Sequence, residues 1–205
     1  MELELLISLA AFATMTLIVP GPNNLLLMAS GANFGVRATL PHIFGAVLGF
    51  TILMAVSVAG LSQVILNAPA LGALLKYGGA CWLVWFGSHY IRAALTTSRH
   101  SGSSRSMRSR PFHFHEAVAF QWVNPGALVL AVSVTGAFAG VADTALSRTI
   151  AICAIFGTVG FLATGLWASL GLQMSSFFRS PRTGPFASGA MGLLIILTAL
   201  MIATK

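Results

Sequence analysis

LIVPGPNNLLLMASG, residues 17–31, lies inside a stretch without Asp, Glu, Lys or Arg that runs from position 5 to position 36. Such a stretch is long enough to cross a membrane as a helix. It is nevertheless interrupted by two prolines around a glycine and then by two amides: Pro20, Gly21, Pro22, Asn23 and Asn24. Because an unsatisfied backbone group in lipid costs several kcal/mol, this break is expected to lie against protein or a water-filled cavity.

The composition of the 205-residue chain is that of an all-α integral membrane protein. Apolar residues make up 57% and charged residues only 7%, where a soluble domain has about 25% charged residues. The start, MELE, is acidic and the apolar run after it is long, so we expect no cleaved signal peptide. The net charge of +7 comes from basic residues between apolar segments, a pattern that does not indicate nucleic-acid binding.

Charged and turn residues divide the chain into six candidate membrane spans. The spans cover residues 5–30, 42–61, 69–90, 116–138, 149–172 and 185–203. An Arg- and Ser-rich stretch, residues 92–111, has the composition of a flexible cytoplasmic linker. We therefore expect a single transmembrane domain over residues 1–205, with a first three-helix repeat at 1–91 and a second at 112–205.

Basic residues predict the orientation of these spans. The loops on one side contain Arg37, Arg92, Arg99, Arg105, Arg108, Arg110, Arg179 and Arg182. The other side has Arg148 and Lys205, with Lys76 inside the third span. Since short basic loops stay in the cytoplasm, the linker is expected inside and both termini on the periplasmic side. The first and fourth spans then cross in opposite directions, so the two halves are inverted.

A second break lies at the matching place of the second half, in QWVNPG at residues 121–126. Paired interrupted helices in inverted halves are typical of secondary transporters. Freed carbonyls and a restarting helix N-terminus together suit the ammonium and carboxylate of an amino acid. The candidate substrate-binding residues are Gly21, Pro22, Asn23, Asn24, Gln121, Trp122, Asn124 and Pro125. The alternative is that these residues only join helices.

Other residues carry weaker signals. His42 and Glu116 are candidates for proton coupling, with simple interfacial placement as the alternative. Gly31-x-x-x-Gly35, Gly45-x-x-x-Gly49 and Gly136-x-x-x-Gly140 predict close helix packing. No metal-site, cofactor or enzyme motif is apparent. Two further hypotheses stay open: an electron carrier that uses Cys81 and Cys153, and an exporter of metal cations or other ions. A homo-oligomer is also possible from the glycine-rich faces.

Three stretches resemble the lysine exporter (LysE) and homoserine/threonine exporter (RhtB) family. They are PGPNNLLLMASGANFGVRATLPHIFGAVLGF at 20–50, LLKYGGACWLVWFGSHYIRAA at 74–94 and FHEAVAFQWVNPGALVLAVSVTGAF at 114–138. The first looks like the branch of cysteine and O-acetylserine exporters. The resemblance implies six spans and proton-driven export of small amino acids or their derivatives across the bacterial inner membrane.

The resemblance can also be followed position by position. Gly21, Pro22, Asn23, Asn24, Asn124 and Pro125 match motif positions of the family. Many members carry a lysine directly after the Asn-Pro pair, where this chain has Gly126. If that lysine assists the substrate or the coupling in other members, the mechanism differs here.

Overall fold

The structure is a computed structural model that describes residues 3–61, 64, 67–97, 110–180 and 182–204. Every regular element in these ranges is a helix, which confirms the all-α prediction. The elements are α1 (Leu3–Ile18), α2 (Pro22–Phe34), α3 (Val36–Val56), the π-helical turn η1 (Ser57–Leu61), α5 (Pro69–Thr97), α6 (Phe114–Val123), α7 (Pro125–Ala137), α8 (Ala145–Gln173), α9 (Ser175–Arg179) and α10 (Gly184–Thr204).

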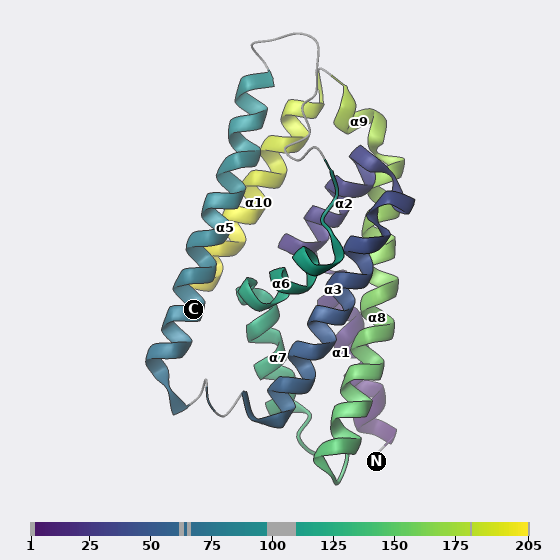
Figure 1. Ribbon diagram of the computed structural model, residues 1–205, viewed down its shortest axis with the longest axis vertical. Coiled ribbons are helices and arrows are strands. Elements are labelled where there is room, and N and C mark those ends of the chain that lie inside the picture. The colour runs from purple at the N-terminus through teal and green to yellow at the C-terminus, as the bar shows by residue number, and fades with distance from the viewer. Residues whose placement is uncertain (1–2, 62–63, 65–66, 98–109, 181, 205) are drawn as a thin grey trace.

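The main helices run up and down the long axis of the molecule (Figure 1). From the N-terminus at the lower end of this view, α1 and α2 lead upward, α3 returns, and α5 leads upward again. In the second half α6 runs across the view, α7 leads downward, α8 leads upward, and α10 descends to the C-terminus.

Three continuous segments of the described chain have the length and apolar composition to cross a membrane: Val36–Leu61, Ala145–Gln173 and Gly184–Met201. The pairs α1–α2 and α6–α7 also qualify, and they are bent at their junctions by 57° and 67°. These pairs bring the total to at most five spans. The 29-residue α5 is a helix where a third span is predicted, but it lies outside this set. The chain is thus a multi-pass membrane protein, and the count of six spans stays a prediction.

Two predicted boundaries differ clearly from the helix ends. The second span is predicted to begin at residue 42, after Pro41, whereas α3 begins at Val36. The helix starts there because Gly35, with φ of 81°, makes the junction in a conformation that favours glycine, and Pro41 is accommodated inside α3. The linker predicted at 92–111 does not begin at 92, because α5 continues to Thr97. Most of that linker, residues 98–109, lies outside the described residues.

Glycines allow several helices to touch backbone to backbone. A Cβ built on Gly49 of α3 would lie 2.8 Å from the Cα of Val118 in α6. On α5 and α10, a Cβ on Gly87 would lie 2.8 Å from the carbonyl oxygen of Gly192, and the reverse distance is 2.7 Å. The predicted packing role of the Gly45–Gly49 spacing is therefore confirmed. The prediction of close helix packing is wrong for Gly136, where a Cβ would meet nothing within 4 Å.

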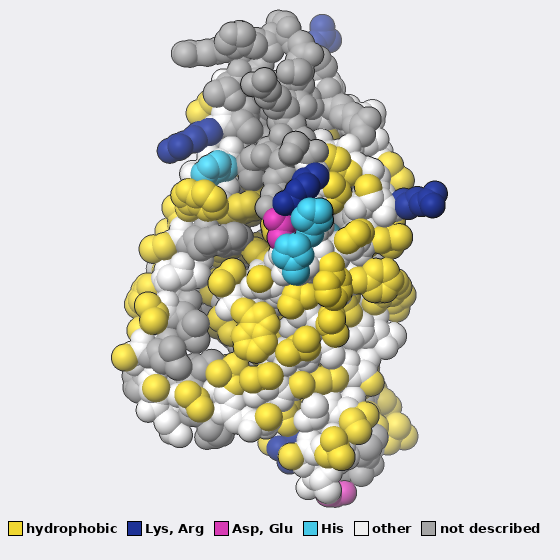
Figure 2. All heavy atoms as spheres, viewed as in Figure 1, with side chains coloured by type: hydrophobic (Ala, Val, Ile, Leu, Met, Phe, Trp, Pro, Cys, Tyr) yellow, Lys and Arg dark blue, Asp and Glu magenta, His cyan; other side chains and the backbone are white. Residues whose placement is uncertain are grey.

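The outer surface of the helices is largely apolar (Figure 2). Met15, Leu162 and Phe186 are 71%, 66% and 72% exposed, although each lies within a helix. On the face shown, Lys and Arg side chains lie in the upper half and near the lower end, with hydrophobic side chains covering much of the surface between them. Such a surface is unsuited to water and is the one expected to face lipid.

Candidate functional site

The first break separates α1 from α2 over residues 19–21. Pro22 is the first residue of α2, where the missing N–H of proline has no partner to lose. Gly21 before it is extended, with φ of −131° and ψ of 175°, as expected of a residue that precedes proline. Asn24 Nδ2 donates to the carbonyl oxygens of Leu17 and Val19, both at 2.9 Å. Asn24 therefore braces the break by satisfying its carbonyls.

The second break consists of a single residue, Asn124, which has φ of −83° and ψ of 107°. Pro125 begins α7 in the same way that Pro22 begins α2. The Oδ1 atom of Asn124 accepts a hydrogen bond from the backbone N–H of Gly126 at 3.1 Å. Asn124 is therefore the N-cap of α7. Its side-chain oxygen already accepts from the N–H of Gly126, one of the backbone donors that the sequence predicts for a substrate.

A cavity of about 280 Å³ lies between the two breaks. Its size is close to the lower limit of pockets for drug-sized ligands, which range from about 300 to 1,000 Å³. The residues that line it are Thr16, Leu17, Val19, Pro20, Gly21, Pro22, Asn23, Asn24, Ala46, Val47, Phe50, Gln121, Asn124, Gly126, Ala127, Leu130, Phe156, Gly160, Ala163, Thr164 and Thr198. None of these described lining residues is charged or a histidine. Both interrupted helices, distant in sequence, thus face one uncharged hollow.

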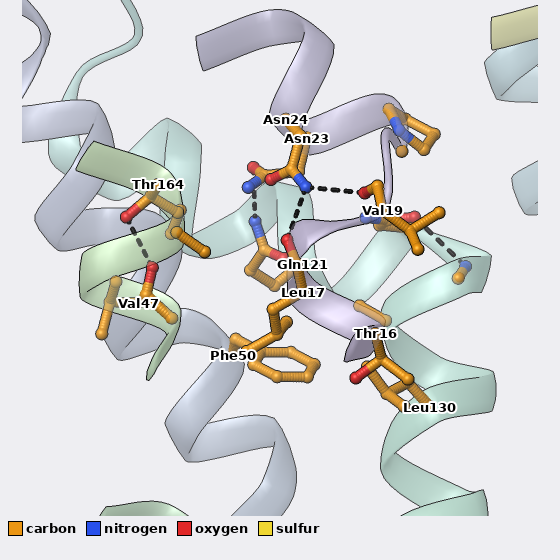
Figure 3. Close-up of a pocket in the computed structure, with 18 of the residues that line it drawn as sticks. Thr16, Leu17, Val19, Asn23, Asn24, Val47, Phe50, Gln121, Leu130 and Thr164 are labelled. Carbon is orange, nitrogen blue, oxygen red and sulfur yellow. Dashed lines mark hydrogen bonds between the residues drawn. The ribbon is translucent and has the colours of Figure 1, made fainter. Parts of the chain in front are cut away.

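Amide side chains gather at one end of this cavity. Figure 3 shows Asn23, Asn24 and Gln121 turned toward one another. Gln121 Nε2 donates to Asn23 Oδ1 at 3.2 Å, a bond that links positions 98 residues apart and joins the two halves of the chain. Within the described part of the chain, Asn23 Nδ2 and Asn24 Oδ1 make no further hydrogen bond. One donor group and one acceptor are therefore available to a ligand here.

The N-termini of α2 and α7 both border the cavity but differ in their capping. No side chain caps α2, whereas Asn124 caps α7. The backbone N–H groups of Asn23 and Asn24, in the first turn of α2, therefore present partial positive charge without a side-chain acceptor. The N-terminus of α2 is the more suitable of the two for a carboxylate.

Two of the predicted binding residues lie outside the cavity lining. Trp122 is partly buried and packs against the hydrophobic core that contains Leu9 and Phe138. Pro125 is buried against α5, where a Cβ on Gly79 would lie 2.8 Å from its Cδ. Neither side chain reaches the cavity, so their predicted contact with substrate lacks support. At the bend of 67° between α6 and α7, both side chains pack against neighbouring helices instead.

The two coupling candidates have different surroundings. His42 is fully buried in α3, one helical turn before the cavity residue Ala46, and its ring centroid lies 4.8 Å from that of Phe112. Glu116 lies in the first turn of α6, where it forms an ion pair with Arg110 at 2.8 Å and accepts from the backbone N–H of His113 at 2.8 Å. The hydrogen bond and the charge of Glu116 raise the pKa of Arg110. Glu116 therefore acts as a helix cap outside the cavity lining.

The described residues do not favour metal or redox chemistry. No group of three His, Cys, Asp or Glu side chains that could hold a metal ion occurs among them. Cys81 is a free, exposed thiol on α5, and Cys153 is a free, half-buried thiol on α8 whose Sγ lies 3.5 Å from the carbonyl oxygen of Thr51. Neither cysteine lines the cavity.

Helices without a break also contribute to the cavity, and no motif in their sequences marks the contributing residues. Thr164 of α8 donates its hydroxyl proton to the carbonyl oxygen of Gly160 at 2.7 Å. Phe50 of α3 and Phe156 of α8 meet edge-on, with ring centroids 5.9 Å apart. In a membrane helix, small, apolar and hydroxyl residues occur both at cavity walls and at helix contacts, so their pattern does not distinguish the two. Thr164, a polar residue inside an apolar span, is the one weak sequence signal for the cavity.

Comparison with known proteins identifies the family. The LysE type translocator family matches residues 14–205, a range that contains both breaks and the whole cavity. The chain belongs to the LysE family. The cysteine/O-acetylserine efflux protein of Escherichia coli K12 is 29% identical over 95% of this chain and 96% of its own length. The protein of the same name from Shigella flexneri is 29% identical over 96% of this chain and 97% of its own length.

No solved structure matches the chain. Membership of the LysE family confirms the resemblance derived from the sequence and makes this a transport protein rather than an enzyme.

Proposed function

We propose that this LysE family protein exports a small neutral amino acid or derivative, of the class of cysteine and O-acetylserine, across the bacterial inner membrane. The observation that carries the proposal is the cavity between the two breaks, with amides and a helix N-terminus but no charged lining residue. The relatives named for cysteine and O-acetylserine efflux support this substrate class.

The polar end of the cavity offers both halves of a zwitterion site. The substrate carboxylate binds the first-turn N–H groups of Asn23 and Asn24 at the N-terminus of α2, where the helix dipole favours negative charge. The ammonium donates to amide oxygens such as Asn24 Oδ1, because an ammonium needs acceptors. No ionised side chain is required, which avoids the high cost of placing a charge inside the membrane.

Six spans in two inverted repeats belong to this proposal. Contacts between the longer helices of the two halves support it, since several have a counterpart when the halves are exchanged. In this exchange α1 and α2 correspond to α6 and α7, and α3 corresponds to α8. The contact between α1 and α8 then matches the contact between α6 and α3, and the contact between α2 and α8 matches that between α7 and α3. In the same way, the contact between α2 and α10 matches that between α7 and α5. By the same exchange α5 corresponds to α10, along which it packs, so α5 is the third span. Rocking of repeats 1–91 and 112–205 about the cavity then gives alternating access.

The orientation follows from the described arginines. The end of α5, the α2–α3 junction and the segment after α9 lie in the upper part of Figure 1, and they carry Arg92, Arg37 and Arg182. The start of α8, with Arg148, lies at the opposite end. By the positive-inside rule the upper end is cytoplasmic, and both termini are periplasmic.

Proton coupling enters the proposal through the family resemblance, and His42 is the better placed of the two candidates. It is buried one turn from the cavity, so a change of its charge acts on α3 next to the substrate. Glu116 is committed to Arg110 and to the start of α6. We expect His42→Gln to abolish uptake driven by a pH gradient while counterflow exchange of substrate persists.

Transport in proteoliposomes tests the proposal. Wild-type protein is expected to exchange labelled cysteine and O-acetylserine but not lysine. Asn23→Ala is expected to lose this exchange, because the substitution removes the side-chain amide whose Nδ2 group is available to a ligand at the polar end. Asn33→Ala is the matched control, since Asn33 lies on the same helix, outside the cavity lining, and bonds to the carbonyl oxygen of Ala29. Wild-type vesicles that exchange no more than empty ones would contradict the proposed function.

A further inference from the structure

The cavity has two chemically different ends (Figure 3). The amides of Asn23, Asn24 and Gln121 form the polar end, as described above. In the view of Figure 3, Phe50 lies below these amides, with Leu130 to one side and Val47 to the other. The second end is therefore walled mainly by apolar side chains, and it continues the volume in which the α-amino acid group is proposed to bind.

One face of α8 lines the cavity. Phe156, Gly160, Ala163 and Thr164 all border the cavity. The last three lie four, seven and eight residues after Phe156, which places all of them on one side of a helix. Small residues at Gly160 and Ala163 keep this side of the cavity open beside the ring of Phe156.

Gly160 is the point on this face where added bulk would enter the cavity. It is buried, yet a Cβ built on it would have only the Cδ1 atom of Leu17 within 4 Å, at 3.9 Å. Leu17 is itself a lining residue. The space in front of Gly160 is thus the cavity rather than a neighbouring helix, in contrast to Gly49 or Gly192, whose Cβ atoms would clash with backbone.

We propose that this apolar end is the subsite for the substrate side chain, that it admits only uncharged side chains, and that Gly160 sets the length it accepts. The inference rests on the proposed function, which places the ammonium and carboxylate at the amide end. A charged side chain would be buried there without a partner, at high cost. The hydroxyl of Thr164 donates to Gly160, so its oxygen is an acceptor for the thiol or hydroxyl proton of a short side chain.

A graded pair of substitutions tests the subsite. Gly160→Ala and Gly160→Val shorten the room for the side chain while leaving the amide end intact. The probes share one α-amino acid group and differ in side-chain length: serine, cysteine, O-acetylserine and methionine. A difference of one methylene in such a pocket changes selectivity about 10-fold or more. We expect Gly160→Val to lower the ratio of O-acetylserine to cysteine exchange by about tenfold, and Gly160→Ala to lower it less.

Gly157→Ala is the matched control. Gly157 lies on α8 nearly one turn earlier, and its added Cβ would lie 3.6 Å from Thr51 Oγ1, away from the cavity lining. This variant makes the same chemical change in the same helix, so it should leave the ratio unchanged. A second readout, the rise in thermal unfolding temperature of detergent-purified protein on addition of each amino acid, measures binding without transport.

The outcomes separate the subsite from the proposed function. A ratio that falls in the Gly160 variants and not in Gly157→Ala supports the subsite. Exchange in wild type with an unchanged ratio in both Gly160 variants overturns the subsite and leaves export standing. A third outcome is that wild-type protein transports no probe but binds the probes according to their size, and that Gly160→Ala alters this binding. This outcome supports the subsite and overturns export. Neither binding nor transport of any probe overturns both.

Discussion

Four amide side chains at the two breaks look alike in the sequence but have different tasks. Asn24 satisfies two carbonyls of its own break, and Asn124 caps the helix that follows it. Asn23 and Gln121 bond to each other across the two halves of the chain. At the scale of single residues, the amides that maintain each break therefore differ from the pair that joins the two halves.

Asn24→Ala should destabilise the protein more than Asn23→Ala. The first leaves the carbonyls of Leu17 and Val19 without their donor, and a membrane helix tolerates an unsatisfied backbone group only where protein or water replaces the lost partner. The second removes one bond to Gln121. Thermal unfolding of both variants in detergent measures the difference. Equal unfolding temperatures would show that Asn24 does not brace the break.

Asn124→Ala should destabilise the start of α7, whereas Asn124→Ser should not. Alanine removes the acceptor for the N–H of Gly126, and loss of such a cap costs about 1 kcal/mol. Serine restores an oxygen at the N-cap. Hydrogen exchange of the first turn of α7 gives the readout. Identical exchange in the two variants would assign another role to Asn124.

At the scale of helices, the cavity depends on two features: the bends at the two breaks and the glycine contacts between helices. Proline at the first position lets α2 and α7 restart at bends of 57° and 67° after their breaks. Glycine contacts then bring α6 onto α3 and α5 onto α10 with no side chain between their backbones. The bends open the cavity, and the close contacts fix the helices around it.

Gly49→Leu should prevent correct packing, and Gly136→Leu should be tolerated. A side chain on Gly49 meets the backbone of Val118, whereas one on Gly136 meets nothing within 4 Å. Small residues at membrane helix interfaces are what permits such close approach. The yield of monodisperse protein and its unfolding temperature are the measurements. A Gly49→Leu protein as stable as the Gly136→Leu control would disprove the tight α3–α6 contact.

At the scale of the molecule, the orientation that we propose for the two inverted repeats can be tested at the two ends of the structure. The loop between α7 and α8 and the segment after α9 lie at opposite ends of the structure. Since the first carries Asp143 and the second Arg182, single cysteines at these positions report on the two sides of the membrane.

In a background without Cys81 and Cys153, Asp143→Cys should react with an impermeant maleimide in intact cells. Arg182→Cys should react only after the membrane is permeabilised, because its loop is cytoplasmic under the positive-inside rule. Both positions are exposed, so accessibility to water is matched. The reverse labelling pattern would invert the proposed orientation, and labelling of both in intact cells would disprove the transmembrane arrangement.

Local sequence by itself determined the class of protein, the course of its helices and the position of both breaks. Low charge and long apolar runs require a membrane. The prolines at positions 22 and 125 stand beside further turn-forming or amide residues and favour a break, whereas the isolated Pro41 stays inside α3. These effects act over a few residues, so they can be read without a fold. The motifs at 20–24 and 121–126 also carried the family resemblance.

Only the tertiary structure decided which polar atoms share one cavity. The bond between Gln121 and Asn23 depends on how helices far apart in the sequence cross. The same crossings pack Trp122 against the core and bring Gly160 and Thr164 to the cavity wall. A helix presents side chains on all sides, and the sequence of an apolar helix does not mark which side meets lipid, a neighbour or a hollow. Packing between helices makes that choice.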